Sequence, residues 1–213
     1  MIARRFMTAV AALGLAGTAA FVSAPSASAD GWDQSPTGTR SLAAVLARDG
    51  SGFDRNWNDF DIVDNAVTAV LTAKPGSPVG VLADGKVALT AFLPTDRAFR
   101  HLASDLTGKH YTSESAVFAD VASLGIDTVE AVLLYHVVPG ATITYRQALA
   151  ADGATLTTAS GGTIQVDVVG RCFVSLVDND PTDRNPFVVR ANLNKGNAQI
   201  AHGISEVLRP LDL

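Results

Sequence analysis

The spacing of apolar residues changes once along this 213-residue chain, near Gly153, and that change decides the class of fold. Before it, apolar residues recur three and four positions apart, as on one face of a helix. After it, in the segment 163–168, apolar and polar residues alternate, as on a strand with one face in solvent. Helices first and strands later predict an α+β domain.

Capping and turn residues divide the two halves into predicted elements. Ser or Thr before a periodic apolar run is an N-cap signal, and Pro or Gly after the run is a stop signal. The predicted helices follow Ser41, span 62–71, follow Thr95, follow Ser113, and run from a capping box at Asp127–Glu130 to Pro139-Gly140. The predicted strands span 87–93, 163–168, 172–177, 187–191 and 204–208.

The first 29 residues have the features of a signal peptide. Arg4 and Arg5 precede an apolar run, and small residues ending at Ala29 form an A-x-A cleavage site. The run is rich in Ala and Gly, whereas a membrane span needs about 20 strongly apolar residues. We therefore expect a signal peptide at 1–29, a flexible leader at 30–39 and one secreted or cell-envelope domain at 40–213.

Charge and cysteine content restrict the partners of the exported chain. Removing residues 1–29 takes away two arginines and no acids, so the net charge changes from −5 to 14 − 21 = −7. A negative surface without a Lys/Arg cluster argues against nucleic-acid binding. Cys172 is the only cysteine, which excludes an intramolecular disulfide and leaves an intermolecular one open. We expect a monomer.

Residues 90–99 read Thr-Ala-Phe-Leu-Pro-Thr-Asp-Arg-Ala-Phe, and this segment resembles the leading motif of the fasciclin domain. That motif is a buried strand, then Pro-Thr-Asn/Asp, then a helix bearing Ala-Phe. Here Pro94, Thr95 and Asp96 occupy the central positions. We expect Thr95 to cap the helix, and Phe92 and Phe99 to meet in the core.

Two later segments strengthen the resemblance. Residues 133–140, Leu-Leu-Tyr-His-Val-Val-Pro-Gly, are similar to the central tyrosine-histidine segment of the family. Residues 197–210 place His202 where the terminal motif has its histidine, although Gly203 stands where an apolar residue is usual. The resemblance covers about residues 40–213, and residues 53–86 are longer than the usual run before the first motif, which indicates an insertion.

The resemblance implies a single α+β domain in which N-terminal helices pack on a β-sandwich or wedge of mostly C-terminal strands. It also implies a secreted, non-catalytic module that acts in adhesion or binding at the cell surface or in the extracellular matrix, and the export signal is of a bacterial type. The partner would be a protein or a polysaccharide. For the tyrosine-histidine pair the resemblance implies a fold-stabilising role or, in animal members, an adhesive one. No catalytic residue, cofactor or metal ligand is expected. The candidate structural or interaction residues are Pro94, Thr95, Asp96, Tyr135, His136 and His202.

Two other functions compete with adhesion. In a secreted hydrolase-like enzyme, Cys172 would be the nucleophile and His136 or His202 the base. The apolar residues after Cys172 instead predict a buried cysteine within a strand, and the common hydrolase motifs G-x-S-x-G, H-E-x-x-H and S-x-x-K are absent from the sequence. The third possibility is a carrier of a small apolar ligand.

Acidic residues gather in two places. The run from Asp178 to Asp183 offers several oxygen ligands for calcium, but it lacks the glycine and glutamate of an EF-hand loop. We therefore expect an Asx-rich turn without a metal. Asp59, Asp61 and Asp64 stand at the start of a predicted helix, where acids suit the helix dipole, and we expect them on a solvated face.

Overall fold

The computed structural model describes residues 38–48, 50 and 52–211. The predicted signal peptide and most of the predicted leader lie outside these residues. Among the described helices, none combines the length and the apolar composition needed to cross a membrane.

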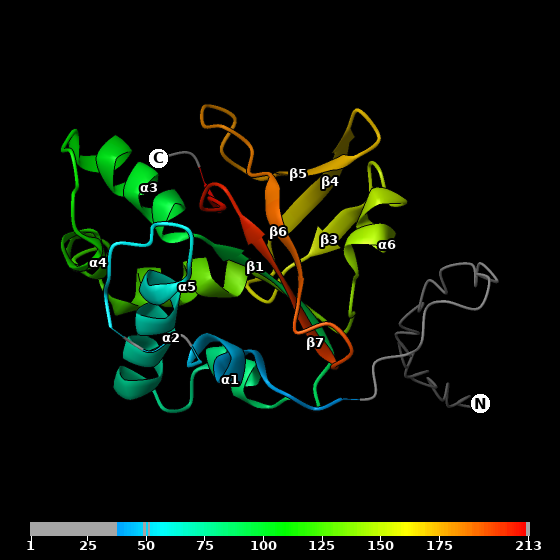
Figure 1. Cartoon of the computed structure of the whole chain (residues 1–213), viewed down its shortest axis with the longest axis horizontal. Coiled ribbons are helices and arrows are strands. Elements are labelled where there is room, and N and C mark those ends of the chain that lie inside the picture. The colour runs from blue at the N-terminus through cyan, green and yellow to red at the C-terminus, as the bar shows by residue number, and fades with distance from the viewer. Residues whose placement is uncertain (1–37, 49, 51, 212–213) are drawn as a thin grey trace, which may run out of the picture. The chain divides into compact units, whose positions relative to one another are not determined.

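The strands of the described chain form two sheets (Figure 1). The larger sheet has the order β2-β1-β7-β6 and the smaller sheet has the order β3-β4-β5. Strand β1 runs parallel to β7, and every other neighbouring pair is antiparallel. The strands are β1 (Leu89–Pro94), β2 (Val137–Pro139), β3 (Thr155–Thr157), β4 (Thr163–Val169), β5 (Phe173–Val177), β6 (Val188–Leu193) and β7 (Gln199–Ile204).

Most of the helices come before the small sheet in the chain and gather on the other side of the large sheet from it (Figure 1). This arrangement confirms the predicted α+β class. The N-caps Ser41, Thr95 and Ser113 form as expected, since each side chain accepts a hydrogen bond from the amide three residues later. The helices are α1 (Leu42–Leu46), α2 (Asp61–Ala73), the 3₁₀-helix η1 (Pro78–Ala83), α3 (Asp96–Thr107), α4 (Glu114–Ala122), α5 (Ile126–Tyr135) and α6 (Tyr145–Leu149).

The large sheet separates two hydrophobic clusters. Successive residues of β1 point to opposite faces, so Ala91 and Leu93 pack with the helices while Phe92 packs with the small sheet. Phe99 belongs to the helical cluster. The expectation that Phe92 and Phe99 meet in one core is therefore wrong, because strand alternation sends Phe92 to the other face.

Helix α5 differs from its prediction at both ends. It begins at Ile126, one residue before Asp127, so its N-cap is Gly125, which has no side chain to cap the helix. The predicted capping box is therefore wrong, and Glu130 bonds Lys74 and Ser77 instead. It ends at Tyr135, well before Pro139. After the C-cap His136, Val137–Pro139 form β2, which pairs with β1 and carries the chain along the edge of the large sheet.

The last described strand, β7, also lies elsewhere than predicted. It spans 199–204, whereas the sequence predicted 204–208. All six residues of β7 are buried, so the strand shows no alternation of polar and apolar residues. Gly203 is required here by close approach: a Cβ would lie 2.9 Å from that of Arg190 and 3.0 Å from the ring of Phe60.

Candidate functional site

His136 is the C-cap of α5 and connects that helix to the segment after β7. Its side chain is 4 % exposed. Nδ1 donates to the carbonyl oxygen of Val132 at 2.7 Å, and Nε2 accepts from the amide of Leu208 at 3.0 Å. Burial lowers the pKa of His136 to about 4, although the bond to Val132 opposes the shift. His136 is thus a neutral imidazole with both nitrogens bonded to backbone.

Tyr135 faces the other cluster and connects α5 to the small sheet. It is fully buried, and its hydroxyl donates to the carbonyl oxygen of Thr163, the first residue of β4, at 2.7 Å. Gly162 lies flat on the ring, where a Cβ would come within 2.8 Å of a ring carbon. The tyrosine-histidine pair therefore holds two separate parts of the fold to one helix end.

The Pro94-Thr95-Asp96 turn leads from β1 into α3 and is buried throughout. The Thr95 amide donates to the carbonyl oxygen of Ile204 at 3.1 Å, which connects the turn to the end of β7. Asp96 accepts from the amides of Asp61 at 3.2 Å and Ile62 at 2.8 Å, so it caps α2 from outside that helix.

His202 lies in β7 beneath the small sheet and is 1 % exposed. Its Nε2 donates to the carbonyl oxygen of Ile143 at 2.9 Å, its Nδ1 accepts from the amide of Asn192 at 3.3 Å, and its ring stacks on Phe92 at 6.0 Å between centroids. The structure thus gives His202 the same arrangement as His136, a buried ring with both nitrogens bonded. Burial lowers the pKa of His202.

Cys172 lies in the turn between β4 and β5 and is exposed, so the expectation of a buried cysteine in a strand is wrong. The turn forms because Gly170 and Arg171 both adopt positive φ, 60° and 66°, which brings the chain back before Phe173. Since the nitrogens of His136 and His202 are all bonded to backbone, neither ring is available as a base for this thiol.

Asp59, Asp61 and Asp64 are buried, 3 %, 4 % and 9 % exposed, so the expectation of a solvated face is wrong. The segment before α2 covers the helix start, and Asp59 comes to lie beside Asp96 of α3 and Glu114 of α4. Burial, a hydrogen bond with Asp59 and the neighbouring carboxylates raise the pKa of Asp96 to about 8, despite the amide of Ile62.

Burial likewise raises the pKa values of Asp64 and Glu114. Sequence reasoning missed Glu114 altogether. Its only signal is its place at the first position of a helix, directly after the cap Ser113, and a solvent-facing acid gives the same signal.

The Asp178–Asp183 run is organised around Arg209. The guanidinium of Arg209 pairs with Asp180 at 3.3 Å, Asp183 at 2.9 Å and Asp105 at 3.0 Å. Burial alone would raise the pKa of Asp180, but hydrogen bonds from Thr182, from the Asp183 amide and from Arg209 lower it to about 2. The carboxylates that a calcium ion would need here are therefore already paired with the guanidinium of Arg209.

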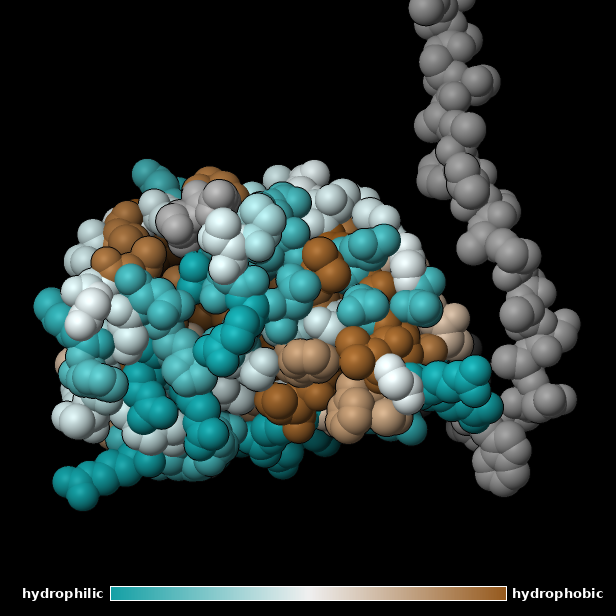
Figure 2. Space-filling view, turned by 90° about the horizontal axis from the view of Figure 1, so that it is seen from above, coloured by the Kyte–Doolittle hydropathy of each residue, from teal (hydrophilic) through white to brown (hydrophobic). Residues whose placement is uncertain are grey.

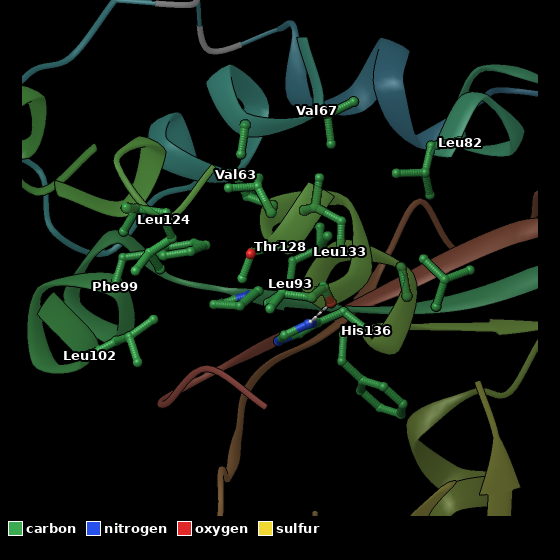
Figure 3. A pocket seen from close by; sticks show the side chains of 18 residues that line it. Val63, Val67, Leu82, Leu93, Phe99, Leu102, Leu124, Thr128, Leu133 and His136 are labelled. Atoms are coloured by element: carbon green, nitrogen blue, oxygen red, sulfur yellow. Dashed lines mark hydrogen bonds between the residues drawn. The ribbon is translucent and has the colours of Figure 1, made fainter. Parts of the chain in front are cut away.

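A small cavity lies between the helices and the large sheet (Figure 3). Val63 and Leu133 reach it from α2 and α5, Leu93 reaches it from β1, and His136 lies on the side away from α2 (Figure 3). Its volume is about 40 Å³, which is room for about three water-sized spheres. This cavity itself is too small for a ligand of benzene size, which occupies a cavity of about 150 Å³.

Three apolar side chains, Val169, Phe173 and Phe187, lie exposed on the outer side of the small sheet, and we call them the apolar face. Their exposed fractions are 43 %, 58 % and 40 %. Val169 pairs with Phe173 across β4 and β5, and Phe187 pairs with Ser175, two residues after Phe173. Paired residues and residues two apart point to the same face. Figure 2 shows apolar side chains gathered on the half of its face that carries the small sheet.

Comparison with known proteins agrees with the α+β fold described above. The Fasciclin domain model matches residues 65–210, which is more than half of the chain. Among solved structures, a FAS1 domain pair from the insect cell adhesion molecule Fasciclin I matches with a TM-score of 0.53 and 15 % sequence identity. The match covers 82 % of this chain and 51 % of that one, so the chain spans about half of its length. No curated protein matches.

Proposed function

Because the chain belongs to the fasciclin domain family, we propose that it is an exported, non-catalytic module that binds a protein or polysaccharide of the cell surface or extracellular matrix. The signal-peptide pattern of residues 1–29 supports export. The solved relative is a cell adhesion molecule, which supports adhesion as the type of activity. Because fold alone does not fix function, the binding surface is argued from this chain's own residues.

The motif residues support a structural role, since they are buried and bonded inward. A partner would have to open the domain to reach His136 at 4 % exposure or His202 at 1 %. Binding through the outer surface needs no such opening. Neither histidine can serve as a base while its nitrogens hold backbone groups, and this favours binding over catalysis.

The single observation that carries the proposal is the apolar face. An aromatic side chain that is 58 % exposed on a regular strand, beside two further apolar residues, leaves apolar area in water that a partner would cover. Aromatic anchors of this kind account for much of the binding energy at protein interfaces. We place the contact surface on the outer side of β4 and β5.

For the test, the full chain is expressed with its own predicted signal peptide, residues 1–29, and the exported protein is purified. Binding to fragments of the native cell envelope is measured by co-sedimentation for the wild type and for a Phe173→Ser, Phe187→Ser double variant. We expect the wild type to sediment with the fragments and the double variant to bind at least ~10-fold more weakly. A 10-fold loss of affinity corresponds to about 1.4 kcal/mol of binding free energy.

A matched control removes exposed apolar residues from the helical side. Leu106 and Leu124 are 42 % and 45 % exposed, and the Leu106→Ser, Leu124→Ser variant should bind as the wild type does. If the wild type binds nothing above background, the binding role fails. If both double variants lose binding equally, the assignment to the apolar face fails.

A further inference from the structure

A cluster of buried carboxylates lies where three helices begin. Asp59 precedes α2, Asp96 opens α3 and Glu114 opens α4, and we call these three residues the carboxylate triad. One carboxylate oxygen from each lies within 4.8 Å of those of the other two. Their exposed fractions are 3 %, 0 % and 1 %. Asp59 forms a second set within the same limit with Asp61, also buried, and with Asp54, which is exposed.

Two oxygens of the triad have no hydrogen-bond partner although they are shielded from solvent. These are Oδ1 of Asp59 and Oε1 of Glu114. The other oxygen of Glu114 accepts from the amide of Asp54 at 2.7 Å. A buried anionic oxygen without a partner is costly, so the carboxyl must either hold a proton or have a positive group nearby. No ion pair among the described residues includes a member of the triad.

The helix dipoles offset only part of this negative charge. Helices α2, α3 and α4 begin at Asp61, Asp96 and Glu114, and each N-terminus carries about half a positive charge. Three such ends supply about +1.5, against −2 while Asp96 and Asp59 share a proton in their hydrogen bond and −3 once a cation displaces that proton. Asp96 also accepts from two backbone amides, one at each of its oxygens.

We propose that the carboxylate triad, together with Asp54 and Asp61, binds one calcium ion. The candidate side-chain ligands are all oxygens, which hard cations prefer to nitrogen and sulfur ligands. Ca²⁺ takes about six to eight oxygen ligands, whereas Mg²⁺ is usually held by one or two carboxylates and keeps several waters. A set of five neighbouring carboxylates therefore suits Ca²⁺ better than Mg²⁺.

The position of the site explains how an ion enters and what it holds. Asp54 is exposed, so it connects the buried triad to solvent. Asp54, Asp59 and Asp61 precede residue 65, where the family match begins, while Asp96 and Glu114 lie within the match. The ion would therefore act as a structural clamp that fastens the segment before α2 to the starts of α3 and α4.

Terbium luminescence tests the site directly. Tb³⁺ replaces Ca²⁺ in oxygen sites, and Trp57, two residues before Asp59, is the light-absorbing donor. The full chain, stripped with EDTA, should sensitise Tb³⁺ emission at one ion per chain, and added Ca²⁺ should abolish it. Calorimetry should give a Ca²⁺ Kd of about 10⁻⁴–10⁻³ M, the range of extracellular modules.

Paired variants give the controls. Glu114→Gln keeps the shape of the side chain and should weaken Ca²⁺ binding at least ~10-fold, since it removes one charged ligand. Asp183→Asn changes the cluster around Arg209 and should bind Ca²⁺ as the wild type does. Circular dichroism checks the fold of both, and Asp59→Asn replaces Glu114→Gln if the latter does not fold.

Three results would overturn the proposal. The first is a wild type that gives no heat and no sensitised emission at millimolar Ca²⁺ or Tb³⁺. The second is equal binding by Glu114→Gln and wild type. The third is a loss of binding in Asp183→Asn alone, which would move the ion to the Asp178–Asp183 loop.

Discussion

The buried, neutral state of His136 makes a quantitative prediction about pH. Its imidazole holds Val132 and Leu208 only while Nε2 is unprotonated, because protonation would turn that acceptor into a donor facing an amide. The unfolded chain has no such constraint and takes up the proton near pH 6.5. Folding therefore becomes less favourable as the pH falls below that value.

The magnitude follows from the two pKa values, about 4 in the folded chain and about 6.5 in the unfolded chain. A group whose folded pKa is depressed contributes its full stability above the unfolded pKa and loses it on acidification. Between pH 7.5 and pH 5 the loss amounts to about 2 kcal/mol, since at pH 5 the unfolded imidazole is almost fully protonated and the folded one is not.

The assay is urea denaturation followed by circular dichroism at pH 7.5 and pH 5 for wild type and His136→Gln. Glutamine cannot titrate, so the stability advantage of the wild type should shrink by about 2 kcal/mol at the lower pH. The raised pKa of Asp96 gives the opposite trend, since protonation of the buried carboxyl stabilises the fold as the pH falls, but it is present in both proteins and cancels.

His110→Gln, which removes an exposed imidazole, is the matched control and should show a constant difference from the wild type. If the wild type keeps the same advantage in unfolding free energy over His136→Gln at both pH values, the conclusion that His136 is buried and neutral is refuted.

Two further predictions concern Arg209 and Cys172. Arg209→Met leaves Asp180 buried without its cation and should cost about 3–5 kcal/mol of unfolding free energy in urea, whereas Arg184→Met at an exposed pair should cost under about 0.5 kcal/mol; equal losses would contradict the role of Arg209. Native protein should react with a thiol reagent at Cys172 without denaturant, and Cys172→Ser should change stability by less than about 0.5 kcal/mol. Labelling that requires unfolding would contradict the exposed turn.

Local signals in the sequence predicted the elements that depend on them. Ser41, Thr95 and Ser113 are caps because a hydroxyl before an apolar run satisfies a free amide whatever the tertiary context. Strand β4 alternates because one face is in solvent, and α2 has its apolar stripe at the buried residues Ile62, Val63, Ala66, Val67 and Val70. These signals sufficed for the fold class and for the order of most elements.

The burial of the carboxylate triad could not be predicted in this way. An acid at the start of a helix is favoured by the dipole whether it faces water or protein, so Asp59 and Glu114 give no distinguishing pattern. What buries them is the path of the segment before α2, and no periodicity encodes that path. The same holds for Cys172, whose exposure depends on the positive φ angles of the two residues before it.

The position of β7 was missed because its polar residues are satisfied by distant backbone groups. Gln199 is fully buried, accepts from the amide of Leu42 and donates to the carbonyl oxygens of Val81 and Asp84. A buried glutamine and a buried histidine in one strand hide it from any pattern of apolar residues.

The place of β7 between β1 and β6 has a consequence for the order of events during synthesis. Leu89 pairs with Gln199, which the ribosome adds 199 − 89 = 110 residues later. Until then the large sheet lacks its middle, and a pairing between such distant partners is slow to close. The proposed export would benefit from this delay, because a chain that has not yet folded can still pass through a narrow translocation channel.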